Sequence, residues 1–306
     1  MTGAIADYAL FGWRVRSAVP LPELLPWRGD DREPDIAILL GAVPPLEGVV
    51  RVHGPAVQIG EGCVRLAIPD IAAYRVDGQN RVTIEPWADP AASDIRVFLF
   101  GTVLAILCYA RGLLPLHAAM VDVEDGAVLL SGNSGLGKST LAGALAQRGC
   151  QLLSDDLCAV AEPSSGPPCI LAPFPRLRLW ADSLAALGFE SDGLERSTTQ
   201  RDKFHLPIAD FRADPLPPRL IVLLRRARLA REVGVRTIEP AEAMRRFELV
   251  HRWRLAQAMG HQQLLFSRMA ALAKSVPIVE LSRLDDLERL GELAETVIRI
   301  ARQPNG

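Results

Sequence analysis

Residues 128–140 read VLLSGNSGLGKST, and the interpretation of the whole chain depends on them. Within them, residues 132–139 fit G-x-x-x-x-G-K-[ST], the pattern of loops that bind nucleotide phosphates. The apolar residues 127–130 predict a buried strand before the loop. The Ala- and Leu-rich residues 140–148 predict a helix after it. A strand, a glycine-rich loop and a helix in this order form the context in which the pattern binds phosphate.

The chemistry of phosphate binding explains these residue types. Glycine lets the backbone turn so that successive N–H groups face a phosphate, at the positive end of the following helix. Lys138 can reach the β- and γ-phosphates, and the Ser139 hydroxyl can bind Mg²⁺. ATP and Mg²⁺ are therefore the expected cofactors. The candidate nucleotide-binding residues are Gly132, Asn133, Ser134, Gly135, Leu136, Gly137, Lys138, Ser139 and Thr140.

A pair of acids follows the next predicted strand. That strand covers residues 150–153, and Asp155 and Asp156 come directly after Ser154. Two adjacent carboxylates can divide two tasks, since one can hold Mg²⁺ while the other accepts a proton from an attacking hydroxyl. In a parallel sheet, a separation of one helix and one strand brings these acids to the edge where the loop lies. An ordinary acidic turn is the alternative, and the placement favours a functional pair.

Composition limits the partners and the compartment. The chain has 306 residues, 49% of them hydrophobic, and a net charge of −2, which argues against nucleic acid or an anionic membrane as the main partner. The 5 cysteines form no C-x-x-C pair, which indicates free thiols in a reducing compartment. The N-terminus has no basic segment followed by an apolar one, so we expect a cytoplasmic protein.

Two domains are expected. Residues 1–90 contain short alternating runs, such as residues 8–17, separated by Gly and Pro, and they predict a mostly β domain. Residues 91–306 hold the loop and the acids and predict an α/β domain. A helix from Ser93 to about Ala110 is apolar on all sides but too short for a membrane span, so we expect it in the core. Amphipathic helices are predicted at residues 240–258, 262–274 and 285–302.

Two features leave alternatives open. His117 begins a predicted strand over residues 116–123, and a lone histidine in an apolar run is usually a hydrogen-bonded core residue. The polar residues 191–203, which include Lys203, fit a mobile loop that carries cations to the phosphates. They fit a solvated connection equally well. Their role stays undecided at this stage.

These residues carry a family resemblance. The segments LHAA (116–119), GNSGLGKS (132–139) and SDD (154–156) resemble the catalytic core of bacterial HPr kinase/phosphorylase. More closely, they resemble the HPr-kinase-related proteins, which include kinases found with lasso-peptide biosynthesis genes. The resemblance implies an α/β fold with a P-loop kinase core of the HPr kinase type, preceded by the β domain. The sequence departs from this family at residues 175–179 (PRLRL), in place of a Glu-rich signature, and no segment for phosphorylase activity is recognisable.

The resemblance also implies roles for individual residues. It places His117 near the γ-phosphate, makes Asp155 the base, and gives Asp156 to Mg²⁺. With the phosphate loop included, the candidate catalytic residues are Asp155, His117 and Lys138. The candidate metal ligands are Ser139 and Asp156.

The function that follows is an ATP-dependent kinase that transfers the γ-phosphoryl group to a Ser or Thr hydroxyl of a peptide or protein. A lasso-peptide precursor is one candidate acceptor. A nucleotide-binding sensor or scaffold with little catalysis, and a small-molecule kinase, are the alternatives. The acid pair favours an enzyme. The chain has neither the L-S-G-G-Q of transport ATPases nor the N-K-x-D of GTPases. A homo-oligomer is compatible with the sequence.

Overall fold

The computed structural model describes residues 5–48, 51–87, 89–162, 166–190, 192–198, 201–208, 211–246, 249–284 and 286–303. Contacts divide the chain into two compact units. The first comprises Met1–Leu113, Ser197–Arg201 and Arg252–Gln262, and the second comprises Leu114–Arg196, Asp202–His251 and Gln263–Gly306. The long segment of the first unit ends at Leu113, beyond the expected boundary near residue 90, because the helix that follows the strands belongs with them. Each unit is described by itself below.

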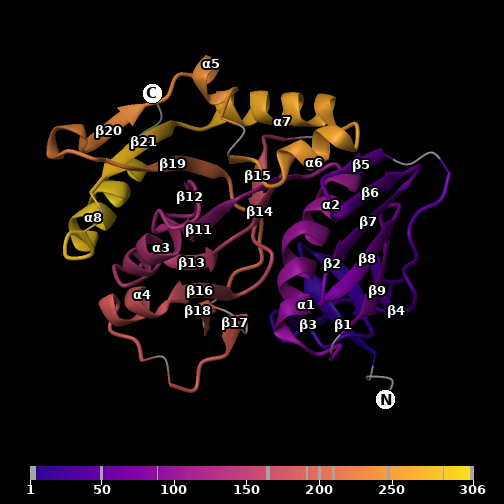
Figure 1. Ribbon diagram of the computed structural model, residues 1–306. Coiled ribbons are helices and arrows are strands. Elements are labelled where there is room, and N and C mark those ends of the chain that lie inside the picture. Colours follow the sequence, from indigo (N-terminus) through magenta and orange to yellow (C-terminus); the bar gives the residue numbers. More distant parts are fainter. Residues whose placement is uncertain are drawn as a thin grey trace. The chain divides into compact units, whose positions relative to one another are not determined.

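A nine-stranded sheet forms the first unit, in the order β3-β1-β2-β4-β9-β8-β7-β6-β5 (Figure 1). Neighbouring strands are antiparallel except for the parallel pairs β2–β4 and β4–β9. The mostly β character expected for the start of the chain is present throughout its described part. The strands are β1 (Ala6–Leu10), β2 (Trp13–Ser17), β3 (Leu25–Pro26), β4 (Ile36–Leu40), β5 (Arg51–His53), β6 (Val57–Gly60), β7 (Cys63–Ile68), β8 (Ala72–Asp77) and β9 (Arg81–Pro86).

The run over residues 8–17 forms a hairpin and not one strand. Leu10 pairs with Trp13, so a two-residue loop joins β1 to β2. Its residues, Phe11 and Gly12, have φ of 53° and 78°. Positive φ at both positions matches the right-handed twist of a hairpin, and glycine adopts it without steric cost. The alternation of the sequence is retained, but the turn reverses the chain in its middle.

The apolar helix consists of α1 (Ser93–Phe98), a π-helical turn (Leu99–Val103) and α2 (Leu104–Ala110). The Tyr74 hydroxyl donates to the Ile95 carbonyl at 2.9 Å, which ties the helix to β8. Among the described residues, this 18-residue helix alone is long and apolar enough for a membrane span, and 61% of it is buried inside the structure. Such burial is typical of a core helix, as the sequence predicts, although the expectation that the helix is too short for a membrane span is wrong.

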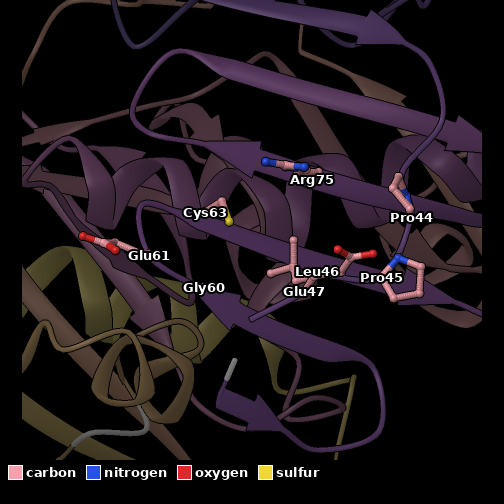
Figure 2. Close-up of a pocket in the computed structure, with 8 residues that line it drawn as sticks. All are labelled: Pro44, Pro45, Leu46, Glu47, Gly60, Glu61, Cys63 and Arg75. Atoms are coloured by element: carbon pink, nitrogen blue, oxygen red, sulfur yellow. The ribbon is translucent and has the colours of Figure 1, made fainter. Parts of the chain in front are cut away.

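A cavity of about 630 Å³ opens on the first unit (Figure 2). Its lining combines a proline pair with one thiol, two carboxylates and one guanidinium. This balance of charge does not favour an anionic ligand. The lining residues are Pro44, Pro45, Leu46, Glu47, Gly60, Glu61, Cys63 and Arg75.

All five cysteines of the chain are free thiols; Cys108 and Cys158 are buried.

A six-stranded mixed sheet forms the centre of the second unit, in the order β13-β11-β12-β19-β21-β20. β11 is antiparallel to both β12 and β13, whereas β19 is parallel to β12 and β21. The sheet is therefore mixed, and β11 lies between the loop strand and the acid strand. These two strands still run in the same direction, so their carboxyl ends share one edge. The strands are β11 (Ala118–Asp122), β12 (Ala127–Ser131), β13 (Gln151–Ser154), β19 (Pro218–Arg226), β20 (Gly234–Thr237) and β21 (Ile278–Arg283).

Helices α3 (Lys138–Ala146) and α8 (Leu290–Ala301) pack together against this sheet. Their apolar side chains, such as Leu145 and Val297, share a buried cluster with Val128 and Val222 of the sheet. The apolar face of α8 and the largely buried side chains of α3 therefore share one common core.

The other predicted helices differ in detail. Residues 240–258 form two short helices, α5 (Pro240–Ala243) and α6 (Trp253–Ala258), and Arg252 before α6 has a left-handed φ of 58°. The helix over residues 262–274 is confirmed as α7 (Gln262–Ser275). The last predicted helix starts later than expected, in α8; its predicted first residue, Asp285, lies outside the described residues.

Shorter elements surround the acid pair. One small sheet has the order β10-β14-β15, and in another β16 pairs with β18. A 3-10 turn, Ala230–Glu232, follows β19. The remaining bounds are β10 (Leu114–Leu116), β14 (Cys158–Ala161), β15 (Cys169–Leu171), β16 (Arg176–Trp180), α4 (Ala181–Ala186), β17 (Arg196–Thr198) and β18 (Arg201–Pro207).

Candidate functional site

The glycine-rich loop joins β12 to the first residue of α3, as the sequence predicts (Figure 1). Gly132, Gly135 and Gly137 have φ of 148°, 84° and 79°, values that side chains rarely tolerate. Space for a side chain is also restricted at Gly132 and Gly137. A Cβ on Gly132 would lie 2.9 Å from the Leu224 carbonyl oxygen. The first and last glycines of the pattern are thus required by their surroundings and their backbone conformation together.

Lys138 lies at the start of α3 and is only 7% exposed. Its ammonium donates to the carbonyl of Gly132 at 2.8 Å and to that of Asn133 at 3.4 Å, so it spans the loop. Burial lowers the pKa of Lys138, while the nearby carboxylates of Asp156 and Asp155 act in the opposite direction. Among the described residues the cation donates to these two backbone carbonyls, which phosphate oxygens can replace.

Ser139, the next residue of α3, contacts Asp155 and not Asp156. Its hydroxyl donates to Asp155 Oδ1, and the other carboxylate oxygen accepts the backbone N–H of Arg178 at 2.9 Å. Asp155 is 3% exposed, so both of its oxygens are engaged inside the protein. Thr140 turns away from the loop, since its hydroxyl lies 2.8 Å from that of Ser183 in α4.

Asp156 is the accessible member of the pair, with 37% of its side chain exposed. One of its oxygens forms an ion pair with Arg178, and the other lies 3.5 Å from His117 Nδ1. Burial raises the pKa of this carboxyl, but Arg178, Lys203 and the other nearby basic groups together outweigh burial and hold the pKa below its usual range. Asp156 is therefore an ionised acid that faces solvent beside a histidine.

His117 lies at the same edge, directly before β11, whose first residue Ala118 pairs with Ser131 at the end of β12. Its Nδ1 is 3.0 Å from the Asp156 carbonyl oxygen. Because a carbonyl only accepts, Nδ1 carries the proton and Nε2 remains an acceptor. Burial lowers the pKa of His117, and Asp156 opposes this shift only in part, so the ring is neutral at neutral pH.

Sequence reasoning did not assign Arg178 to the site. It lies on β16, where Leu177 and Leu179 are 1% exposed and alternate with the arginines. Its guanidinium pairs with Asp156 and comes to 4.0 Å from Asp155. Burial opposes ionisation, yet the two carboxylates raise its pKa above the usual value. The alternation of the PRLRL segment is the signal that could have placed this arginine on the polar face of a strand.

Lys203 also acts on this site, but from a strand and not from a loop. It lies on β18 opposite Trp180 of β16, and its charge lowers the pKa of both Asp156 and Lys138. The interpretation of residues 191–203 as one loop is thus incorrect at Lys203. Ser191, Thr199 and Gln200, which belong to the same expectation, lie outside the described residues.

Metal binding can be judged from the donor atoms. Among the residues that the structure describes, no group of three or more His, Cys, Asp or Glu side chains could hold a metal ion. One hydroxyl and two carboxylates nevertheless meet at this edge, on Ser139, Asp155 and Asp156. Mg²⁺ prefers such oxygen donors and is often held by one or two carboxylates, substrate phosphates and water. The donor set fits Mg²⁺ bound together with a nucleotide.

Comparison with known proteins finds similarity to HPr kinases in the part of the chain that holds the loop and the acid pair. Residues 113–166 match the HPr Serine kinase C-terminal domain. An HPr kinase/phosphorylase of Azoarcus sp. (strain BH72) is 30% identical over 115 residues, which cover 37% of this chain and 33% of that protein. The matched part thus spans about a third of that relative.

A similarity of lower degree extends further along the chain. The structure of the HPr(Ser) kinase/phosphatase from Coxiella burnetii aligns with 61% of this chain and 95% of its own, at 16% identity and a TM-score of 0.34. A TM-score this low does not establish a shared fold. The family model and the sequence match show that this part of the chain is similar to HPr kinases, which agrees with the resemblance carried by its motifs.

Proposed function

We propose that this protein is an ATP-dependent kinase with a P-loop core, which transfers the γ-phosphoryl group to a Ser or Thr hydroxyl of a peptide or protein. One observation carries the proposal. The glycine-rich loop with Lys138 and the acid pair with His117 meet at one edge of the second unit's sheet, and Ser139 contacts Asp155 there. The similarity of residues 113–166 to the HPr Serine kinase C-terminal domain supports the same reaction class.

Binding of the nucleotide falls to the loop and to Lys138. Residues 132–137 provide backbone N–H groups at the start of α3, where the helix dipole favours negative charge. The Lys138 ammonium exchanges its two carbonyl acceptors for phosphate oxygens, which carry full charge and form stronger hydrogen bonds. The low exposure of this lysine strengthens that contact, because water screens it little.

Mg²⁺, when bound with the nucleotide, neutralises charge on the phosphates. Two assignments of the acids follow from different arguments. The family resemblance makes Asp155 the base and gives Asp156 to the metal. The contacts favour the reverse, because Asp155 already lies on the Ser139 hydroxyl, whereas Asp156 is exposed toward an incoming acceptor. In either assignment, one acid of the pair is the base and the other is the Mg²⁺ ligand.

Transfer then proceeds in line. The acceptor oxygen bonds to the γ-phosphorus as the bond to the β–γ bridging oxygen breaks, ADP departs with that oxygen, and the acceptor proton passes to a carboxylate of the pair. A positioned base contributes roughly 10²- to 10⁴-fold. In a loose transition state the positioning of the groups contributes more. Neutral His117 offers Nε2 as an acceptor that can orient the attacking hydroxyl.

The proposed phosphoryl acceptor rests on the resemblance to HPr-kinase-related proteins. We propose a peptide or protein with a Ser or Thr hydroxyl, in the cytoplasm, and a lasso-peptide precursor as one specific candidate. The products of genes that neighbour this one are the first acceptors to assay. A sensor that binds the nucleotide without transfer is the competing outcome.

Substitution of the two acids tests the proposal. Asp155→Asn and Asp156→Asn nearly preserve shape but remove a carboxylate. The variant that loses the base should keep MgATP affinity and lose single-turnover transfer. The variant that loses the metal ligand should recover transfer at higher Mg²⁺. Parent rates in both variants, across the full Mg²⁺ titration, would contradict a catalytic role for the pair.

A further inference from the structure

We propose that Arg283 is a positioning residue that holds the glycine-rich loop in its phosphate-binding conformation. The inference rests on the proposed nucleotide binding at this loop. Arg283 ends β21, is buried, and bridges two backbone carbonyls. Its Nη2 donates to the carbonyl of Leu136 in the loop at 2.8 Å, and its Nη1 donates to that of Leu284 at 3.1 Å.

The sheet topology brings this arginine to the loop. β12, β19 and β21 run in the same direction, so their carboxyl ends share one edge. In the β19–β21 strand register, Arg226 at the end of β19 lies opposite Arg283. The backbone N–H of Ala227 donates to the Arg283 carbonyl at 2.7 Å. In the strand order, β21 lies on one side of the loop strand and β13, with the acid pair, lies on the other. Arg283 therefore supports the loop from the side opposite the acids.

The contact fixes the direction of a peptide group. In a trans peptide the C=O and the N–H point in opposite directions. Because Arg283 holds the Leu136 carbonyl toward itself, the Gly137 N–H is directed away from the guanidinium. Successive N–H groups that converge in this way form a concave anion site. The hydrogen bond thus determines which face of the peptide is offered to a phosphate.

Steric fit at Gly137 supports the same role. A Cβ at this position would lie 2.3 Å from Arg283 Nη2, far inside van der Waals contact. Gly135 has a similar φ, 84° against 79°, but a Cβ there would meet nothing within 4 Å. Alanine at either position strains the backbone alike, whereas only Gly137→Ala also displaces the arginine. The two glycines form a matched pair for a test.

Arginine suits this position better than lysine. A guanidinium presents its donors in a rigid planar fork, so one group reaches two carbonyls at once. Lysine keeps the positive charge but concentrates its donors on one nitrogen. Arg283→Lys therefore separates the effect of charge from the effect of the bridge, and Arg283→Met removes both.

Two measurements test the role. Calorimetry gives MgATP affinity, and hydrogen exchange gives the protection of the amides of residues 132–140, in the parent, Arg283→Lys and Arg283→Met. We expect both variants to expose the loop amides and to lose about tenfold or more in affinity, with Arg283→Met the weaker binder. Parent protection and parent affinity in a folded Arg283→Lys would overturn the proposal. A parent that binds no nucleotide would overturn the proposed function instead, while the exchange data would still decide the role of Arg283.

The glycine pair provides the control. In the parent background, Gly137→Ala should cost more affinity than Gly135→Ala. In the Arg283→Met background the difference between the two should shrink, because the clash partner is gone. Equal losses for both glycines in both backgrounds would show that the Arg283 contact does not set the loop, and that backbone strain explains the effect.

Discussion

Lys138 is a buried cation that donates to two backbone carbonyls of the loop, and this makes it sensitive to substitution. Lys138→Ala removes a charged donor from the proposed phosphate site. A hydrogen bond to a charged group is worth about 1.5–3 kcal/mol. We therefore expect MgATP affinity to fall about 10- to 100-fold, measured by calorimetry.

The thermal stability of the free protein should respond to Lys138→Ala differently from its MgATP affinity. Burial lowers the pKa of Lys138, which means that the protonated side chain is costly in the folded state without nucleotide. Lys138→Ala should consequently leave the Tm of the free protein unchanged or higher. Lys274→Ala, on an exposed position of α7, is the control and should change neither quantity. Equal MgATP affinity in both variants would contradict the role of Lys138.

At this scale the sequence predicted which residues gather, but not how they pair. The loop pattern and the acid pair depend on local spacing, which can be read directly. The contact of Ser139 with Asp155, and the ion pair of Arg178 with Asp156, depend on strands distant in sequence. Side-chain contacts of this kind require the packing of β16 near the end of β13, which no local pattern contains.

At the scale of elements, the β1–β2 hairpin carries an ion cluster that predicts a pH dependence. Asp7 accepts from Arg16 at 2.8 Å and from Arg14 at 2.9 Å. The hydrogen bond from Arg16 lowers the pKa of Asp7 to about 2; burial opposes the shift and Arg14 adds to it. The folded pKa is below the unfolded value of about 3.9, so this contribution to stability is present above pH ~4 and is lost as the pH falls toward 2.

Asp7→Asn should therefore lower the free energy of unfolding at neutral pH by a value on the order of 1 kcal/mol, since the cluster is partly screened by solvent. The difference from the parent should disappear between pH ~4 and 2. Urea unfolding at several pH values measures it. Asp77→Asn, at the end of β8 with one arginine partner, serves as the comparison. A constant difference at all pH values would contradict the assignment to Asp7.

Elements with a strong local signal were predicted well. β12, the loop and α3 follow from an apolar run, glycines and a helix-forming segment, all adjacent in sequence. The β11–β12 hairpin is a local pairing across the turn at Asp125 and Gly126, but the pairing of β11 with β13 is non-local and could not be predicted. The break between α5 and α6 likewise depends on Arg252, whose left-handed backbone interrupts a pattern that looks continuous.

At the scale of the whole molecule, the direction of the reaction is testable. The residues after β16 do not carry a recognisable phosphorylase segment, so we expect transfer from ATP without efficient reversal by inorganic phosphate. A phosphorylated acceptor should release little pyrophosphate when it is incubated with the protein and phosphate. The same acceptor, unphosphorylated and supplied with ATP, provides the positive control. Rapid pyrophosphate release would show that phosphorolysis is retained.

The central claim is phosphoryl transfer to a hydroxyl. The most direct measurement supplies γ-labelled ATP and Mg²⁺, together with a Ser/Thr peptide library and the products of neighbouring genes, to the parent and to Lys138→Ala. The account predicts label on serine or threonine in the parent and its loss, or a large reduction, in the variant. Label that stays on ATP, or leaves only as inorganic phosphate while MgATP binds normally, would contradict the kinase and make the protein a nucleotide sensor.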